Sequence, residues 1–236
     1  MRDAGSASAI ARSFKRGILL DIEGTTTPIS FVYDVLFPYA RQRMSTYVRN
    51  ADLTDLRREY ESDVQSGNNP PLWSNDPVPY LHWLMDQDRK STALKRIQGE
   101  IWRDGYCSGE LHGEVFDDVP AALRRWHDAG IDIRIFSSGS VLAQRLIFST
   151  TLQGDLTEFL SGYFDTTTGP KNESQSYATI AAAFAIPASE ILFISDIIRE
   201  LDAARAAGMQ TLLCVRPGNH QQPAHTHKVT SSFVIV

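Results

Sequence analysis

The chain is organised around the sequence GILLDIEGTTTP, which occupies residues 17–28. Its apolar beginning predicts a strand over residues 17–22 that is buried in a core. Asp21 and Glu23 follow where the sequence turns polar and contains a glycine. An ionised carboxylate is costly in an apolar interior unless it has a partner. Two of them at the end of a buried strand therefore predict a site that holds a ligand, a metal ion or a charged partner.

Composition limits the classes of function. The 236 residues fit one large α/β domain or a core with an inserted module. The 23 Lys and Arg and 28 Asp and Glu give a formal charge of −5 without a long basic run, which argues against nucleic acid as the main partner. Cys107 and Cys214 lack metal-ligand or redox spacing, so we expect reduced thiols. Because no apolar run could span a bilayer and residues 1–16 lack the apolar segment of a signal peptide, we expect a cytoplasmic protein without membrane association.

Helix and strand patterns alternate from residue 115 onward. Short apolar runs, typical of strands covered on both faces of a parallel sheet, occupy residues 131–136, 191–194 and 211–215. Helical patterns occupy residues 119–129, with Asp118 as the expected N-cap, and residues 141–148, 174–185 and 199–207. This order predicts the α/β class, with a doubly wound, Rossmann-like parallel sheet.

Residues 31–114 follow a different pattern, with helical spacing and no convincing strand. We therefore expect two domains: a core formed by residues 1–30 and 115–236, and an all-helical insert over 31–114. The insert leaves the sheet just after the two carboxylates and returns to it, so it is placed to act as a lid. Trp73, Tyr80, Trp83 and Trp102 are expected to pack this insert, with a place in a ligand pocket as the alternative for one or two of them.

The ends of the predicted strands carry polar residues that suit one chemistry. Ser137 and Ser138 end the second strand, Asp196 ends a later one, and Lys171 lies in a loop before a helix. In open parallel sheets ligands bind beyond the carboxyl ends of the strands, so these side chains should share one rim with Asp21. Hydroxyls and a lysine can hold phosphate oxygens, and carboxylates can hold Mg²⁺. The rim predicts a phosphate ester bound together with a divalent metal.

These motifs resemble the haloacid dehalogenase (HAD) superfamily and, within it, the enolase-phosphatases of methionine salvage. The resemblance rests on LDIEGTTTPI at residues 20–29, DVLFPYA at 34–40, FSSGS at 136–140, the Lys171 loop and RPGN at 216–219. Most HAD phosphatases have Asp where this chain has Glu23. The resemblance implies a HAD-like core with an inserted helical cap.

The resemblance also implies roles for individual residues. Asp21 matches the aspartate nucleophile, and Glu23 matches a general acid and base that is also associated with the metal site. Ser137 and Ser138 match substrate-binding residues, and Lys171 matches the lysine that offsets phosphate charge. The implied ligands of one Mg²⁺ per chain are Asp21, Glu23 and Asp196.

The implied reaction has two parts. A phosphorylated diketone with a methylthio tail, 2,3-diketo-5-methylthiopentyl-1-phosphate, is enolised and then hydrolysed to an acireductone and phosphate. A HAD phosphatase for another small phosphorylated metabolite and a catalytically silent binding module are the alternatives. We expect a monomer.

Several residues have a simpler structural interpretation. Ser140 is expected to cap the following helix, and Glu200 to act, if at all, through neighbouring residues. His220, His225 and His227 lie in a tail rich in Pro and Gln, which favours a surface loop over a metal site. The hydroxyls of residues 25–27 belong to a turn, and the backbone of this turn is a further candidate for contact with phosphate or metal.

Overall fold

The computed structural model describes residues 16–236. The expectation that residues 1–16 contain no signal peptide therefore falls almost wholly outside the described residues. The described chain forms two compact units. One comprises the described residues up to Val32 together with His112–Val236, and the other is Tyr33–Leu111. No helix in residues 16–236 is both long and apolar enough to cross a membrane.

The first unit is built on a six-stranded sheet in which every neighbouring pair is parallel. The strand order is β3-β2-β1-β4-β5-β6. The strands are β1 Gly17–Leu20, β2 Asp132–Phe136, β3 Gly162–Phe164, β4 Ile191–Ser195, β5 Gln210–Cys214 and β6 Lys228–Thr230. The chain moves outward from β1 to β2 and β3, then returns to the other side of β1, so β1 and β4 flank the point at which the winding reverses. The predicted α/β class with a doubly wound parallel sheet is confirmed.

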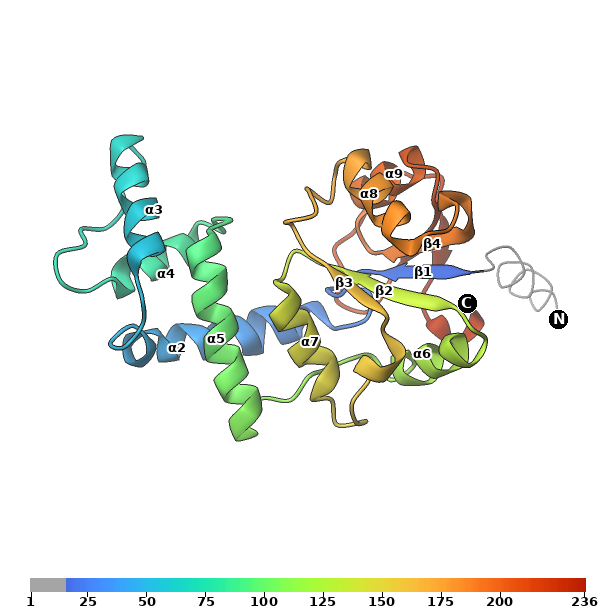
Figure 1. Ribbon diagram of the computed structural model, residues 1–236, viewed down its shortest axis with the longest axis horizontal. Helices are drawn as coiled ribbons and strands as arrows, with labels where there is room; N and C mark the ends of the chain where they lie inside the picture. The colour runs from blue at the N-terminus through green and yellow to red at the C-terminus, as the bar shows by residue number, and fades with distance from the viewer. Residues whose placement is uncertain (1–15) are drawn as a thin grey trace. The chain divides into compact units, whose positions relative to one another are not determined.

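Helices cover both faces of this sheet. In Figure 1, α8 and α9 lie on one face and α6 and α7 on the other. Their bounds are α6 Val119–Asp128, α7 Val141–Ser149, α8 Ser174–Phe184 and α9 Ile198–Ala206, with short 3₁₀ segments η2 Thr157–Phe159, η3 Ala188–Glu190 and η4 Phe233–Ile235. The two central strands between these layers, β1 and β4, are buried on both faces, which explains their continuous apolar runs.

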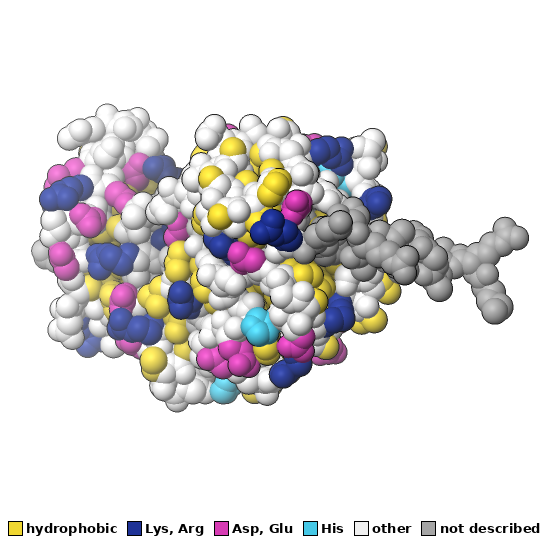
Figure 2. Space-filling model, turned by 45° about the vertical axis from the view of Figure 1, so that its right-hand side comes forward, with side chains coloured by type: hydrophobic (Ala, Val, Ile, Leu, Met, Phe, Trp, Pro, Cys, Tyr) yellow, Lys and Arg dark blue, Asp and Glu magenta, His cyan; other side chains and the backbone are white. Residues whose placement is uncertain are grey.

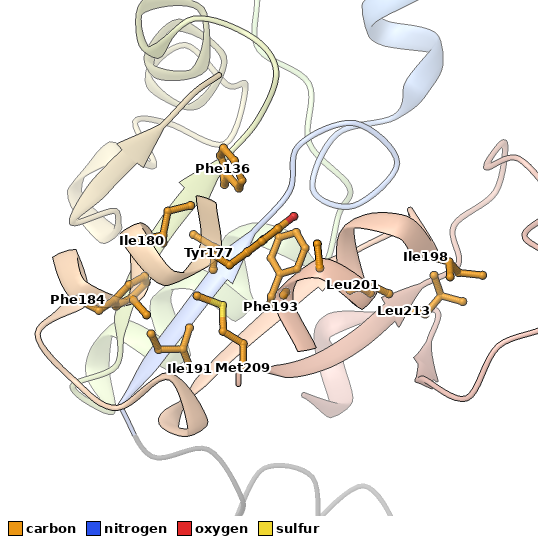
Figure 3. Close-up of a cluster of buried hydrophobic side chains, with 14 residues drawn as sticks. Phe136, Tyr177, Ile180, Phe184, Ile191, Phe193, Ile198, Leu201, Met209 and Leu213 are labelled. Atoms are coloured by element: carbon orange, nitrogen blue, oxygen red, sulfur yellow. The ribbon is translucent and has the colours of Figure 1, made fainter. Parts of the chain in front are cut away.

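A hydrophobic cluster fills the space between the sheet and the helices α8 and α9 (Figure 3). Tyr177 of α8 lies at its centre, with ring centroids 5.5 Å from Phe136 of β2 and 5.1 Å from Phe193 of β4. Both phenylalanines are fully buried. This packing fixes α8 against the ends of β2 and β4, where the polar residues of the rim begin.

All the regular elements of the second unit are helices, joined by loops. Its elements are the π-helix η1 Phe31–Leu36, which begins in the first unit, and α2 Phe37–Tyr47, α3 Thr54–Gln65, α4 Val78–Asp86 and α5 Thr92–Ser108. Ser91 caps α5 by accepting a hydrogen bond from the backbone N–H of Leu94 at 2.9 Å. Tyr60 packs edge-on against Trp73 and Tyr80, and Tyr80 stacks on Trp83. The aromatic side chains of the insert thus serve as packing, as expected.

Figure 2 shows Lys and Arg side chains intermingled with Asp and Glu over the described part of the face in view. This pattern follows from the nearly balanced numbers of acidic and basic residues. A phosphate backbone is bound by clustered positive charge, which this mixed face does not offer.

Three expectations were wrong in detail. β3 and β6 are strands of three residues each that the apolar pattern does not reveal. His227 is buried rather than on the surface, with its Nε2 2.9 Å from Asp202 Oδ1 and its Nδ1 2.8 Å from Thr211 Oγ1. Asp118 lies at the N-cap position of α6, but its side chain makes no capping hydrogen bond.

Asp118 instead forms a largely buried ion pair with Arg216. Arg216 Nη1 donates to Asp118 Oδ2 at 2.9 Å and to the carbonyl of Ser231 at 3.0 Å, while its Nε donates to the carbonyl of Thr25 at 3.3 Å. The hydroxyl of Ser232 also donates to Asp118 Oδ2, at 2.7 Å. One guanidinium therefore ties the turn after β1 to the start of α6 and to the C-terminal segment. Burial raises the pKa of Asp118, but the hydrogen bonds from Arg216 and Ser232 more than offset this and hold it below its ordinary value.

We predict that Phe193→Ala lowers the free energy of unfolding by about 3–5 kcal/mol, because it leaves a cavity beneath Tyr177. Chemical denaturation followed by circular dichroism measures the loss. The control is Leu152→Ala in the same unit, where the side chain is 81% exposed and should change stability by less than about 0.5 kcal/mol. An equal loss in both variants would contradict the assignment of the core.

We predict a pH-dependent effect for Asp118→Asn. At pH 7 the variant leaves Arg216 buried without its counterion and should lose roughly 3 kcal/mol of stability. Because the pKa of Asp118 is lower in the folded state, its contribution is complete above the unfolded pKa of about 4 and is lost as pH falls through the folded value. The difference between wild type and variant, measured by urea unfolding from pH 6 to pH 2.5, should shrink toward acid. A difference that is constant over this range would exclude the ionised pair as its cause.

Candidate active site

Asp21 lies immediately after the last residue of β1. Its backbone N–H donates to the carbonyl of Ile194 at 3.0 Å, which continues the pairing between β1 and β4 by one step. Only 4% of the residue is exposed. The backbone pairing of β1 with β4 thus fixes the position of this carboxylate at the rim of the sheet.

Three groups donate hydrogen bonds to the Asp21 carboxylate. Lys171 Nζ and the backbone N–H of Ile22 donate to Oδ1 at 2.6 and 2.8 Å. Ser195 Oγ lies 3.0 Å from Oδ2. These contacts fix the orientation of the carboxylate.

Lys171 is shared between two carboxylates. Its Nζ lies 2.8 Å from Glu200 Oε2, in addition to its contact with Asp21. The hydroxyl of Tyr177 donates to the Lys171 carbonyl at 2.8 Å, so the core cluster also positions the lysine backbone. Burial lowers the pKa of the Lys171 ammonium, but the charges of Asp21 and Glu200 outweigh it and raise this pKa. The lysine is therefore charged across the physiological pH range.

Glu200 and Asp196 complete a buried acidic cluster. Burial raises the pKa of Asp196 to about 8, with further increases from the charges of Asp21 and Glu200. Burial likewise raises the pKa of Glu200 to about 7, although Lys171 partly offsets it. Ser195 Oγ lies 3.0 Å from Glu200 Oε2, so its single proton is shared between that carboxylate and Asp21. When its three carboxylates are all ionised, the cluster carries more negative charge than Lys171 balances, which is why these pKa values are raised.

The turn after β1 is closed by its own backbone. The N–H groups of Thr25, Thr26 and Thr27 donate to the carbonyl of Ile22 at 3.1, 2.9 and 2.9 Å. These three N–H groups are therefore already hydrogen-bonded within the turn, so they do not supply the expected backbone contact with phosphate. Glu23 is half-buried within the turn, where its backbone bridges to Thr27.

The predicted substrate-binding serines follow β2, the other neighbour of β1 in the sheet. Ser137 is buried, and its Oγ accepts a hydrogen bond from the backbone N–H of Gly139 at 3.1 Å, which leaves the hydroxyl proton able to donate to a ligand. Ser138 is half-buried beside it. Ser140 accepts from the N–H of Ala143 at 3.3 Å and caps α7, as expected.

The donor set suits a hard divalent cation. No group of three or more His, Cys, Asp or Glu side chains suited to a metal ion is found within residues 16–236, so Asp21, Glu23 and Asp196 are not assembled as three side-chain ligands. Mg²⁺, however, needs only one or two carboxylates and keeps several waters. Gly24, with φ of 70°, lets the Asp196 carboxylate pack directly against the turn, since a Cβ at this position would lie 2.5 Å from Asp196 Oδ2. Two buried carboxylates held close to one turn and short of positive charge fit Mg²⁺ at Asp21 and Asp196.

The sequence identified most of this site but not all of it. It placed Asp21, Lys171 and Asp196 at one rim, and the structure brings them together. It missed the direct contact of Ser195 with Asp21 and gave Glu200 only an indirect role. The signal for Glu200 was present, because it lies in the first turn of α9, a helix that begins two residues after Asp196.

Comparison with known proteins places the chain among related enzymes. A family model described as haloacid dehalogenase-like hydrolase matches residues 15–208. The "Enolase-phosphatase E1" of Synechococcus elongatus is 51% identical over 86% of this chain and 89% of its own length. A Vitis vinifera protein named "Probable bifunctional methylthioribulose-1-phosphate dehydratase/enolase-phosphatase E1 1" is 45% identical over 93% of this chain and 46% of its own length.

A solved structure agrees with the fold. The crystal structure of the UTR4 protein from Saccharomyces cerevisiae has a TM-score of 0.77 and 34% identity, and the match covers 94% of this chain and all of that one. The family resemblance expected from the sequence is confirmed. The chain matches its relatives over most of its length, and Asp21 lies at the carboxyl edge of its parallel sheet. This chain therefore belongs to the haloacid dehalogenase-like hydrolases and, within them, to the enolase-phosphatase E1 family.

Proposed function

We propose that this chain is the enolase-phosphatase of methionine salvage, acting on 2,3-diketo-5-methylthiopentyl-1-phosphate. The observation that carries the proposal is the buried Asp21 carboxylate held 2.6 Å from the Lys171 ammonium at the rim of the sheet. A fixed carboxylate beside a cation that attracts phosphate suits nucleophilic displacement at phosphorus. The names of the relatives supply the two activities, enolase and phosphatase.

The phosphatase half of the reaction uses Asp21 as the nucleophile. One carboxylate oxygen forms a bond to phosphorus as the bond from phosphorus to the substrate oxygen breaks, and the departing oxygen takes a proton. Water then attacks the aspartyl-phosphate, releases inorganic phosphate and restores the carboxylate. A dianionic phosphate repels a carboxylate, so Lys171 lowers the barrier by offsetting their charges.

Asp21 and Asp196 are the residues that would hold Mg²⁺. When bound there, Mg²⁺ supplies positive charge that offsets the phosphate and polarises carbonyl oxygens of the substrate. The raised pKa of Asp196 supports this assignment, because it reports a buried carboxylate whose negative charge lacks sufficient compensation.

The enolase half requires removal of a proton from carbon beside a carbonyl. The electron pair of that C–H bond forms the C=C bond of an enolate, and the charge moves to the carbonyl oxygen. Glu23 is the proposed base, since its carboxyl group belongs to the turn that directly follows Asp21 and is half-buried there. Enolisation precedes hydrolysis, and the same carboxyl can return a proton to the departing oxygen.

The proposed diketone substrate agrees with the dehydratase reaction that the name of the Vitis vinifera relative includes. That name joins a methylthioribulose-1-phosphate dehydratase to an enolase-phosphatase in one protein. Loss of water from a ketose phosphate converts neighbouring hydroxyl-bearing carbons into an enol, and the enol rearranges to a second carbonyl. A dehydratase of this kind therefore supplies a diketone phosphate, the substrate proposed here.

The proposal also covers phosphate binding, the cap, the cellular compartment and the oligomeric state. Ser137 and Ser138 bind the phosphate group, and the helical insert over residues 31–114 is the cap of the enzyme. Cys107 and Cys214 are free, which supports a reduced, cytoplasmic setting. We propose a monomer, which light scattering at micromolar concentration tests directly.

Replacing Asp21 by Asn should reduce Mg²⁺-dependent phosphate release at least about 10³-fold, because the amide cannot form the acyl phosphate. The measurement is phosphate release from the diketone phosphate beside a panel of sugar phosphates. Asp155→Asn, an exposed aspartate in the same unit, is the control and should retain full activity. Activity that survives in Asp21→Asn would overturn the mechanism, and faster turnover of a sugar phosphate by wild type would overturn the substrate.

Glu23→Gln tests the assignment of the base. The amide cannot accept the carbon-bound proton, so we expect enolate formation, followed by ultraviolet absorbance in single turnover, to fall by about 10²-fold or more. Thermal melting should show an intact fold. The control is Glu114→Gln, an exposed glutamate that should not affect either step. Enolisation at the wild-type rate in Glu23→Gln would assign the base to another residue.

A further inference from the structure

Asn219 has a buried oxygen atom with no hydrogen-bond partner within the described chain. It belongs to the segment after β5, and its Oδ1 is fully shielded from solvent. An acceptor left unpaired in the interior costs about 1–3 kcal/mol. Such an atom in a tightly packed turn calls for a donor that is supplied by something other than the protein.

The orientation of the Asn219 amide is fixed by its nitrogen. Nδ2 donates to the carbonyl of Gly24 at 2.9 Å and to the carbonyl of Cys214 at 3.2 Å. Two carbonyl acceptors on one side identify that side as the NH₂ group, because an oxygen placed there would be repelled by both. Oδ1 therefore has to point away from them.

The direction in which Oδ1 points is given by its neighbours. A Cβ placed on Gly24 would lie 2.9 Å from Asn219 Oδ1 and 2.5 Å from Asp196 Oδ2. Both oxygens thus converge on the same side of the turn that follows Asp21. Two acceptors packed against the same glycine, one of them a buried carboxylate, favour a nearby positive charge or hydrogen-bond donor.

We propose that Asn219 is a positioning residue of the cation site, with Oδ1 accepting a hydrogen bond from a water molecule bound to the cation at Asp21 and Asp196. This inference rests on the proposed Mg²⁺ site and deepens it. Mg²⁺ keeps several waters when it binds to carboxylates, and each of these waters is a strong donor. Residues that hydrogen-bond to the ligands of a metal ion orient those ligands, and loss of such a residue commonly weakens metal binding by about 10–100-fold.

The test measures cation affinity and stability separately. Mn²⁺ binding is followed by the loss of its free electron paramagnetic resonance signal, and Mg²⁺ binding by calorimetry, in wild type, Asn219→Ala, Asn219→Asp and the exposed control Asn50→Ala. The melting temperature of each metal-free protein measures the contribution to stability of the hydrogen bonds that Nδ2 donates to Gly24 and Cys214. Both Asn219 variants lose these hydrogen bonds, so both should melt at a lower temperature.

The two variants differ in the acceptor. Asn219→Ala removes it and should bind Mn²⁺ at least 10-fold more weakly, whereas Asn219→Asp retains an oxygen there and should bind as tightly as wild type or more tightly. Equal weakening in both would mean that Asn219 only holds the turn, and unchanged affinity in Asn219→Ala would also overturn the inference. Absence of binding by wild type would instead refute the metal site of the proposed function.

Discussion

The structure depends on how a buried cluster of like charges is held together. Asp21, Asp196 and Glu200 are carboxylates at one rim of the sheet, and Lys171 pairs with two of them. Such a cluster is unfavourable by itself, as the raised pKa values of Asp196 and Glu200 show. It persists because β1 and β4 are paired by backbone hydrogen bonds and because the core beneath Tyr177 fixes the Lys171 loop. Stability supplied by the core thus maintains an excess of negative charge that a cation can neutralise.

The parts of the fold that the sequence reveals are those with a strong local signal. β1, β2, β4 and β5 each contain a run of buried apolar residues, and each was recognised to within about two residues. β3 and β6 have only three residues each, so their existence depends on pairing with β2 and β5 rather than on their own composition. Asp118 precedes a helix and so matches the pattern of a cap, yet Arg216, almost a hundred residues later, takes its carboxylate. The local sequence is compatible with Asp118 either as a helix cap or as an ion-pair partner, and the distant Arg216 selects the second role.

The candidate site was predictable to a similar degree and for similar reasons. Parallel strands deliver their carboxyl ends to one rim, so Asp21, Ser137 and Asp196 could be grouped without coordinates. The partners of Asp21 could not be assigned, because Lys171 reaches it from a loop and its position depends on the packing of α8. His227 shows the opposite error: its tail looks unstructured in sequence, but contacts with Asp202 and Thr211 bury it.

The sharing of Lys171 between two carboxylates has a consequence for the proposed reaction. Once Asp21 carries the phosphoryl group, the negative charge moves from its carboxylate to the phosphoryl oxygens, so the ion pair between Asp21 and Lys171 is replaced by an interaction with the phosphoryl group. Glu200, 2.8 Å from the ammonium, is not phosphorylated, so its contact with Lys171 does not depend on the state of Asp21. The lysine is therefore held in place for the attack of water, and the second carboxylate, which is costly in the resting enzyme, positions the lysine in the phosphorylated one.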